Sequence, residues 1–484
     1  MQYGPHFQTG GLLTQSLQDV TNVTWIASLG IHYKLGIDGL NVLLIGLTTL
    51  LFAVSLLASN LRSSSTALTR PALYYFFFAL AESAVLGAFL AQDLALFVAF
   101  FDLMLIPYYF IIAIWGRGSR QQRLRATLKL VVYTFVGSLL MLAAAVATGV
   151  LAAERSGRHI DFALSALQGV HLSSGSQDWI FLLFAAAFLV KMPAFPLQGW
   201  MPDGYRAMPT EALMTFSGVL SKVGAYGFLA IVLPLFPKAS VHFQMLMLII
   251  ALISIIYGSI LAFSQTDARL IAGYSSVAQL GFITLGIFSF TSQGAQGALL
   301  QMVNHGLVVA PIFFIILLLS MRAKGSEDIR NMGGIAVRAP VLASLFLIVA
   351  LATLAMPGSS NFVGEFLILL GVFRAKLPIA IIAFAGVVGA SVYALRLFIR
   401  SMHNRTGSEV HSFDISLRDG LVLGPLIAAI LFLALYPQPA LRRSERSTAA
   451  AIAPARLVSA HKPLPTLHVF AQVRQTHSEG QGGK

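Results

Sequence analysis

The chain has 484 residues and a formal net charge of +13; 57% of its residues are hydrophobic and only 11% are charged. A soluble domain carries roughly 25% charged residues, so this chain has too few of them to cover a globule with polar surface. This excludes a soluble enzyme and makes lipid the expected solvent. Cysteine is absent, which excludes disulfides, thiolate metal sites and iron–sulfur clusters held by these residues.

Apolar stretches long enough to cross a bilayer recur along nearly the whole chain. They are expected to be helices, because an open strand edge leaves backbone groups unsatisfied in hydrocarbon. At about 20 residues per crossing, they predict an all-α polytopic membrane protein with about twelve transmembrane segments. The segments lie near 39–60, 72–91, 94–115, 130–152, 179–200, 211–234, 243–263, 270–290, 297–321, 339–372, 378–400 and 419–437.

The remaining sequence predicts two flanking regions around one transmembrane domain, residues 39–437. Residues 1–38 are fairly polar, contain no secretory signal pattern, and are predicted to lie outside the membrane. Residues 438–484 are basic, contain few apolar runs, and are predicted to be a disordered tail. No long linker interrupts the part between them.

Basic residues are distributed unequally between the two sets of loops. The connections after odd-numbered segments hold most of the loop Lys and Arg residues. The positive-inside rule therefore places this side in the cytoplasm and both termini outside. These loops and the tail account for the net charge, and no basic stretch interleaved with aromatic residues indicates a nucleic-acid site.

Five ionisable side chains lie inside the apolar segments, where a charge costs about 2.5–3.5 kcal/mol on insertion scales. They are Asp102, Lys191, Lys222, His305 and Glu365. Intramembrane ionisable residues usually face a protein interior and mark an ion path. The sequence shows no metal-ligand cluster, nucleophile triad or phosphate loop beside them, which argues against a self-contained enzyme site.

Each of these residues also has a structural alternative. Asp102 could be an isolated partner for a lysine, Lys222 could tie two helices together, and Glu365 could cap a half-helix. His305 could be a satisfied core histidine. Lys191 could be a snorkelling anchor, although it lies deep in an apolar run.

Two segments contain helix-breaking residues close to these charges. Pro193 and Pro196 follow Lys191, and residues 357–360 (Pro-Gly-Ser-Ser) precede Glu365. Proline removes a backbone donor and clashes with the preceding turn, so each segment is predicted to be a broken helix; a packing kink is the alternative. The breaks lie in the fifth and tenth segments, five positions apart, which predicts two five-helix repeats, the second inverted because five is odd. Paired breaks in inverted halves indicate a transporter site.

Several stretches of the sequence match motifs of a known family, in the same order along the chain. They are LFVAFFDLMLIPYYFIIAIWG, LVKMPAFPLQGWMPDGYRAMPTEAL, LSKVGAYGFLAIVLPLFP, FSQTDARLIAGYSSVAQLGF, QMVNHGLVVAPIFFI and LATLAMPGSSNFVGEFLILLG. Together they resemble the antiporter-like subunits of NADH:quinone oxidoreductase (respiratory complex I). The motifs MPGSSNFVGEF and YPQP, with the short tail, favour the subunit M (chain 4) type over subunits L and N.

The resemblance implies a subunit that translocates protons, driven by quinone reduction elsewhere in the complex. It implies no cofactor in this chain, with NADH, FMN, iron–sulfur clusters and quinone bound by partner subunits. The implied partners are other membrane subunits, of the neighbouring L and N types, in the lipid of the cell inner (plasma) membrane. The alternatives are a subunit of a multi-subunit cation/proton antiporter or membrane-bound hydrogenase, and a non-pumping structural subunit.

The resemblance also implies a role for each ionisable residue. Asp102 stands where the family has a glutamate that pairs with the lysine at Lys191, the central switch. Lys222 would continue the relay, and His305 would lie between the lysines and Glu365, the terminal carboxylate.

Several positions depart from the family pattern. Asp102 is one methylene shorter than glutamate, which predicts a looser or water-bridged ion pair. Gln198 and Tyr205 replace two histidines, and Ala278-Gln279 replaces a Ser-His pair, which removes a relay histidine. The first two of the family's fourteen helices have no counterpart in this sequence. These departures bear on the efficiency of pumping more than on the fold.

Overall fold

Each predicted membrane segment is helical in the computed structural model, which describes residues 17–63, 68–405, 410–411 and 413–460. Within these residues, ten helical spans are long and apolar enough to cross a bilayer. The two predicted segments that are not among them, near 179–200 and 339–372, are the ones that contain the predicted breaks. The protein is an all-α polytopic membrane protein, as predicted.

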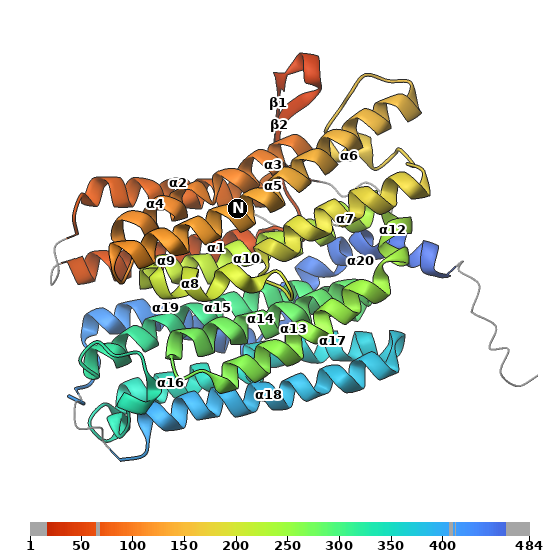
Figure 1. The fold of residues 1–484 in the computed structure, drawn as a ribbon. Coiled ribbons are helices and arrows are strands. Elements are labelled where there is room, and N and C mark those ends of the chain that lie inside the picture. The colour runs from red at the N-terminus through yellow and green to blue at the C-terminus, as the bar shows by residue number, and fades with distance from the viewer. Residues whose placement is uncertain (1–16, 64–67, 406–409, 412, 461–484) are drawn as a thin grey trace, which may run out of the picture.

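The first repeat follows α1 (Val42–Ser63) and occupies the upper part of Figure 1. It consists of α2 (Pro71–Leu90), α3 (Leu94–Leu103) with α4 (Ile106–Trp115), α5 (Arg120–Ser156), α7 (Ser174–Lys191) with α8 (Met201–Ala207), and a run through α9 (Thr210–Thr215), η4 (Phe216–Leu220), α10 (Ser221–Gly227), η5 (Phe228–Val232) and α11 (Leu233–Leu235). Short elements lie between them: α6 (Leu164–Leu167), η3 (Gln198–Trp200) and α12 (Pro237–His242).

The second repeat occupies the lower part of the same view. It consists of α13 (Gln244–Ser264), α14 (Ala268–Phe288), α15 (Ser292–Arg322), α16 (Pro340–Thr353) with α17 (Ser360–Ala375), and α18 (Leu377–Met402). The 3-10 turns η6 (Ile329–Asn331) and η7 (Ile335–Val337) precede α16, and α19 (Leu417–Leu435) and α20 (Gln438–Ala460) follow the repeat.

The two repeats pack in the same pattern. The third helix packs against the broken fourth in each, α5 against α7 and α15 against α17. The first helix contacts the fifth in each, α2 against α10 and α13 against α18. This correspondence supports the predicted pair of five-helix repeats with one broken helix apiece.

Both predicted breaks are present. α7 ends at Lys191, and the chain runs without regular helix to η3, with a cis bond between Phe195 and Pro196. α16 ends at Thr353, and Ala355 and Gly358 adopt positive φ values of 52° and 92° before α17 begins. Proline at both sites prevents the regular hydrogen-bond pattern from continuing.

Two helix features differ from the predicted boundaries. α5 begins at Arg120 rather than near residue 130, because Ser119 and Gln122 form a capping box that starts the helix in the basic loop. The predicted segment 94–115 is divided into α3 and α4 at Met104–Leu105, directly after Asp102. Pro107 in the first turn of α4 explains the interruption.

A hairpin precedes the bundle. β1 (Gln18–Ile26) and β2 (Ile31–Ile37) pair antiparallel, with Asn22 opposite Lys34, and project from the bundle (Figure 1). The sequence analysis predicted this region only as extramembrane, and that location stays a prediction. Residues 1–16 lie outside the described residues.

The predicted disorder of residues 438–484 is wrong for residues 438–460, which form α20. This helix packs against α15, α11 and α12. Its buried residues recur every three to four positions and are mostly small, which allows close helix approach. They are Ala440, Ser444, Ser447, Thr448, Ala451, Ile452 and Ala455. A pattern of small residues carries little average hydropathy, which is why composition missed it. Residues 461–484 lie outside the described residues.

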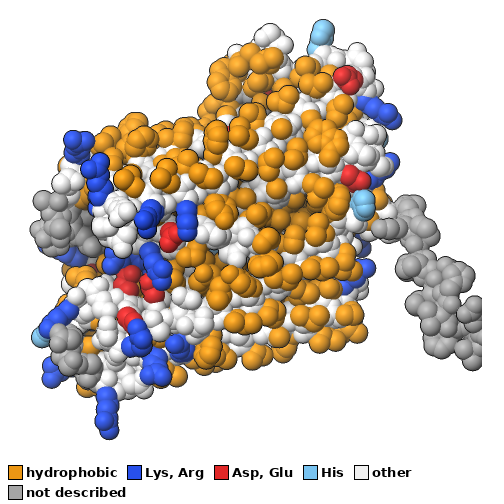
Figure 2. Space-filling model, viewed as in Figure 1, with side chains coloured by type: hydrophobic (Ala, Val, Ile, Leu, Met, Phe, Trp, Pro, Cys, Tyr) orange, Lys and Arg blue, Asp and Glu red, His pale blue; other side chains and the backbone are white. Residues whose placement is uncertain are grey.

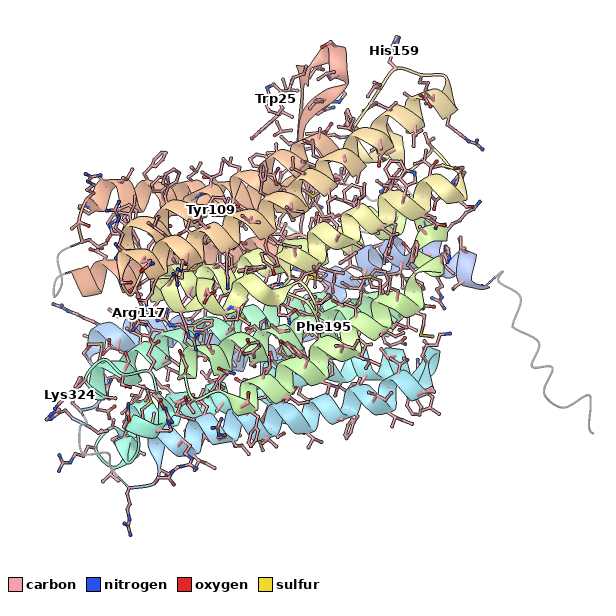
Figure 3. All side chains as sticks on the ribbon, viewed as in Figure 1. Trp25, Tyr109, Arg117, His159, Phe195 and Lys324 are labelled. Carbon is pink, nitrogen blue, oxygen red and sulfur yellow. The ribbon has the colours of Figure 1, made fainter. Side chains whose placement is uncertain are left out.

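The surface agrees with a membrane location. Hydrophobic side chains cover the flank of the bundle, and Lys and Arg side chains gather at one end (Figure 2). Arg117 and Lys324 lie at this end, whereas His159 lies at the opposite end (Figure 3).

Candidate functional site

Lys191, the last residue of α7, is buried, with 4% of its surface exposed. Its ammonium donates a hydrogen bond to the carbonyl oxygen of Phe101 at 3.1 Å and lies 4.2 Å from the centre of the Phe101 ring. A cation over an aromatic face is attracted by the ring quadrupole. The helix break after Lys191 therefore positions the ammonium against α3, in the interior of the bundle.

Asp102 does not form the direct ion pair with Lys191 that the resemblance implied. Its carboxylate accepts a hydrogen bond from the Ser138 hydroxyl of α5. The Lys191 ammonium is near enough to interact electrostatically, but the structure has no bond between the two side chains. The aspartate is one methylene shorter than the family's glutamate, and it points toward α5. That the shorter side chain makes this pair looser or water-bridged stays a prediction.

Lys222 is completely buried in α10. Its ammonium donates to the carbonyl oxygen of Ser217 at 2.5 Å and to the Ser221 hydroxyl at 3.2 Å. π-helical segments flank α10 on both sides, and such segments frequently mark functional sites. The Ser217 carbonyl, which lies in the π-helical segment η4 and also accepts from the Ser221 hydroxyl, thus serves as an acceptor for the buried ammonium.

His305 lies on α15 with 3% of its surface exposed, within electrostatic reach of the Lys222 ammonium. Its neighbour Gly306 allows the approach: a Cβ there would lie 2.6 Å from the Gly218 carbonyl oxygen, so only glycine fits. His305 Nδ1 has no hydrogen-bond partner in the described protein. A histidine held in the core by protein hydrogen bonds, one alternative for this position, is not supported at Nδ1, and the relay role of His305 stays a prediction.

Glu365 is 2% exposed on α17, just after the second break. Its Oε1 accepts a hydrogen bond from Gln279 Nε2 of α14 at 2.8 Å. Gln301 Nε2 of α15 lies 3.4 Å from the same oxygen. Glu365 lies five residues beyond the start of α17, too far into the helix to cap it, and its partners are on other helices.

Hydroxyl groups connect the two repeats between Lys222 and α14. The hydroxyls of Ser217 and Ser276 lie 3.4 Å apart, and both residues are buried. Tyr108 of α4 and Thr215 of α9 share a 2.7 Å hydrogen bond one turn away. Polar groups therefore continue from the lysine region into the second repeat.

At the basic end of the bundle, a buried guanidinium group links three segments of the chain. Arg269, 1% exposed, donates to the carbonyl oxygens of Met208 at 2.6 Å and Tyr205 at 3.2 Å, and pairs with Glu327 at 2.9 Å. Arg117 also pairs with Glu327. Burial alone would raise the pKa of Glu327, but the two guanidinium groups outweigh it and hold this pKa below its ordinary value.

The predicted site residues therefore fall into two groups. Lys222 and His305 interact electrostatically, as do Lys191 and Asp102, but no direct hydrogen bond joins either pair. Asp102, Lys191 and Glu365 instead bind groups on neighbouring helices. Sequence reasoning missed Phe101, Gln301 and Ser138 as their partners. Gln301 had a signal, since it lies about one turn before His305 and is flanked by the apolar residues Leu299, Leu300, Met302 and Val303. Of the departures, Tyr205 is fully buried, and Gln279 binds Glu365.

Comparisons with known proteins agree with this architecture. Residues 91–391 match the family model described as NADH:quinone oxidoreductase/Mrp antiporter, TM. NADH-quinone oxidoreductase subunit M of Rhodobacter capsulatus is 36% identical over 429 residues, covering 87% of this chain and 82% of the relative. Subunit M of Escherichia coli K12 is 37% identical over 451 residues, covering 90% and 87%.

Solved structures give the same result. A chain of respiratory complex I from Thermus thermophilus with bound NADH has a TM-score of 0.83 and 30% identity, covering 90% of this chain and 89% of that chain. A chain of the Mrp complex from Dietzia sp. has a TM-score of 0.77 and 19% identity, covering 91% and 88%, which shows a shared fold alone. The chain therefore belongs to the membrane-spanning family of NADH:quinone oxidoreductase and Mrp antiporter subunits.

Proposed function

We propose that this chain is the proton-translocating subunit M of an NADH:quinone oxidoreductase. The observation that carries the proposal is the series of buried ionisable side chains through both repeats: Lys191, Lys222, His305 and Glu365, each at most 4% exposed. A structural scaffold has no need to bear the cost of burying them. The subunit M relatives, at 36–37% identity, favour this enzyme over a cation/proton antiporter or hydrogenase.

Lys191 acts as the switch in the proposed mechanism. A buried ammonium is destabilised by the loss of water and stabilised by a nearby carboxylate. Rotation of Asp102 away from Ser138 and toward Lys191 therefore raises the affinity of the lysine for a proton, and the reverse rotation lowers it. The polar groups around Lys222 receive the released proton.

The second repeat completes the path. From Lys222 the proton passes to His305, which is within its electrostatic reach, and then to Glu365, from which it leaves the subunit. Each charge moved against 100 mV costs about 2.3 kcal/mol. The side chains of this path supply no such energy, so it arrives from quinone reduction in partner subunits, which bind NADH, FMN, iron–sulfur clusters and quinone.

The proposed setting follows from the surface. The end that carries Arg117 and Lys324 (Figure 3) faces the cytoplasm by the positive-inside rule. Both termini then lie outside, and residues 1–38 with their hairpin lie outside the membrane. The proposed partners are the neighbouring antiporter-like subunits of L and N type in the cell inner membrane.

A deletion and complementation experiment tests this function. Membranes from cells with and without this chain are assayed for NADH-driven quinone reduction and acidification, and the chain is purified in mild detergent. The proposal predicts co-purification of NADH-oxidising subunits and loss of NADH-driven pumping without the chain. Co-purification with cation/proton antiporter or hydrogenase subunits, or unchanged pumping after deletion, would contradict it.

A further inference from the structure

Four helices converge on the Glu365 carboxylate. Gln279 of α14 donates to Glu365 Oε1 at 2.8 Å, and Gln301 of α15 donates to Gln279 Oε1 at 2.8 Å. Tyr393 of α18, which accepts a 3.0 Å hydrogen bond from Ser275, lies within electrostatic reach of the carboxylate. All five side chains are buried, so this is a built polar site and not a surface cluster.

The hydrogen-bond chain fixes the orientation of the Gln279 amide. An amide side chain offers donors at its nitrogen and acceptors at its oxygen. Because the oxygen of Gln279 accepts from Gln301, its nitrogen is directed at Glu365. Gln301 reinforces this arrangement, since its nitrogen also lies 3.4 Å from Glu365 Oε1.

The side-chain N–H groups of Gln279 and Gln301 therefore both point at the same carboxylate oxygen. Glu365 Oε1 faces two N–H groups, whereas the buried Oε2 accepts no hydrogen bond from the described protein. A proton on Oε1 would point at N–H donors and displace them. Oε2 is the oxygen that can take a proton without breaking the Gln301–Gln279–Glu365 chain.

The backbone around the carboxylate fits the same arrangement. Gly364, next to Glu365, leaves no room for a Cβ against the Gln301 side chain. On α15, His305 follows Gln301 by four residues, so both lie on one face of that helix. Asn304 of the same helix donates to the Ser360 carbonyl at the start of α17 at 2.6 Å. This bond holds α15 against the start of α17, the helix that carries Glu365.

We propose that Gln279 and Gln301 are positioning residues that hold Glu365 by Oε1 and direct its proton to Oε2. The inference rests on the proposed function and deepens it. A glutamine amide does not ionise in the physiological range, so Gln279 takes no part in carrying the proton. The path to Glu365 therefore runs along α15 from His305 and bypasses α14.

The test uses the assembled complex in proteoliposomes, with two readouts. One is the number of protons pumped per NADH oxidised; the other is the infrared band of the protonated Glu365 carboxyl, identified by its loss in Glu365→Gln. Gln279→Leu removes the hydrogen bond to Glu365 Oε1, so it is expected to lower the number of protons pumped per NADH and to shift the band. Gln279→His, which restores an N–H donor, is expected to recover both.

Controls separate the possible failures. Gln244→Leu removes another partly buried glutamine, which donates to the Phe288 carbonyl at 2.9 Å, and is expected to change neither readout. If Gln279→Leu does not assemble, the shorter Gln279→Asn tests the same loss of reach. Normal pumping in Glu365→Gln would overturn the proposed function itself. Lost pumping in Glu365→Gln, with normal pumping and an unshifted band in Gln279→Leu or Gln279→Asn, would overturn only the positioning role.

Discussion

The ammonium of Lys191 is held by Phe101, the residue just before Asp102. It donates to the Phe101 carbonyl at 3.1 Å and lies over the ring of the same residue. The Asp102 carboxylate is engaged by Ser138 of α5 instead. The two charged groups of the proposed switch therefore interact electrostatically without a direct bond, and the proposed switching step is a rotation of the aspartate side chain toward the lysine.

The charge of Asp102 is expected to matter more than its length. Asp102→Asn removes the charge that stabilises a protonated Lys191, so we expect it to lower the number of protons pumped per NADH severalfold. Asp102→Glu adds one methylene and is expected to keep pumping. Acidification by proteoliposomes containing each complex measures the effect. Full pumping by Asp102→Asn would show that this carboxylate plays no part in switching Lys191.

Ser138 is expected to set the rest position of Asp102. Ser138→Ala removes a hydrogen bond to a charged group, worth about 1.5–3 kcal/mol. The carboxylate then turns toward Lys191, the nearest cation, and holds it charged, which slows pumping. The initial rate of acidification measures this, with Ser156→Ala at the end of the same helix as control. Equal rates in the two variants would argue against the role of Ser138.

Lys222 is expected to be indispensable for pumping but not for folding. Lys222→Met keeps an unbranched side chain of similar size, which adapts readily to a buried space, while removing the proton-carrying group. We expect an assembled complex without proton pumping. Lys129→Met is the control, because the Lys129–Asp203 pair is exposed and such pairs contribute about 0–1 kcal/mol. A pumping Lys222→Met complex would remove this lysine from the path.

Arg269 is expected to stabilise the basic end of the bundle. Removal of one partner of a buried ion pair costs about 3–5 kcal/mol, and Arg269→Met also leaves the Met208 and Tyr205 carbonyls without their donor. Thermal unfolding of the purified complex is expected to begin at a lower temperature. Arg330→Met, which removes an exposed local pair with Asp328, is the control and is expected to change little.

Lowering the pH of the solution is expected to weaken the ion pair between Arg269 and Glu327. The folded pKa of Glu327 is lowered from its ordinary value of 4.5, so its pairing stabilises the protein fully above that value. The stabilisation is lost as the pH falls below 4.5 through the lowered folded pKa. Unfolding measured between neutral pH and acid should show the difference between wild type and Glu327→Gln shrinking over that range. A difference that is constant with pH would contradict the ion-pair account.

The membrane helices and the two breaks could be predicted because they depend on strong local signals. Long apolar runs require helices in lipid, and proline next to Lys191 or before Glu365 interrupts them wherever they pack. α20 could not be predicted in the same way. Its buried seam uses Ala and Ser residues such as Ala440 and Ser444, whose burial depends on neighbouring helices and not on their own hydropathy.

The ionisable residues of the site were found, but their partners were not. A charge in an apolar run is conspicuous in a sequence, whereas the carbonyl of Phe101 and the hydroxyl of Ser138 resemble those of any other residue. The resemblance to a family with a glutamate at Asp102 suggested a direct pair with Lys191. One missing methylene and a hydroxyl on α5 changed the geometry. The distances between these side chains depend on how the helices pack against one another, and this packing could not be predicted from the sequence.

The number of protons pumped per NADH by complexes carrying Lys191→Ala tests the central claim most directly. It is compared with Lys238→Ala, which changes an exposed lysine outside the buried series, at equal rates of NADH oxidation. The account predicts that Lys191→Ala pumps fewer protons per NADH while Lys238→Ala matches the wild type. An unchanged ratio in Lys191→Ala would show that protons cross this subunit by a route that does not use its buried lysine.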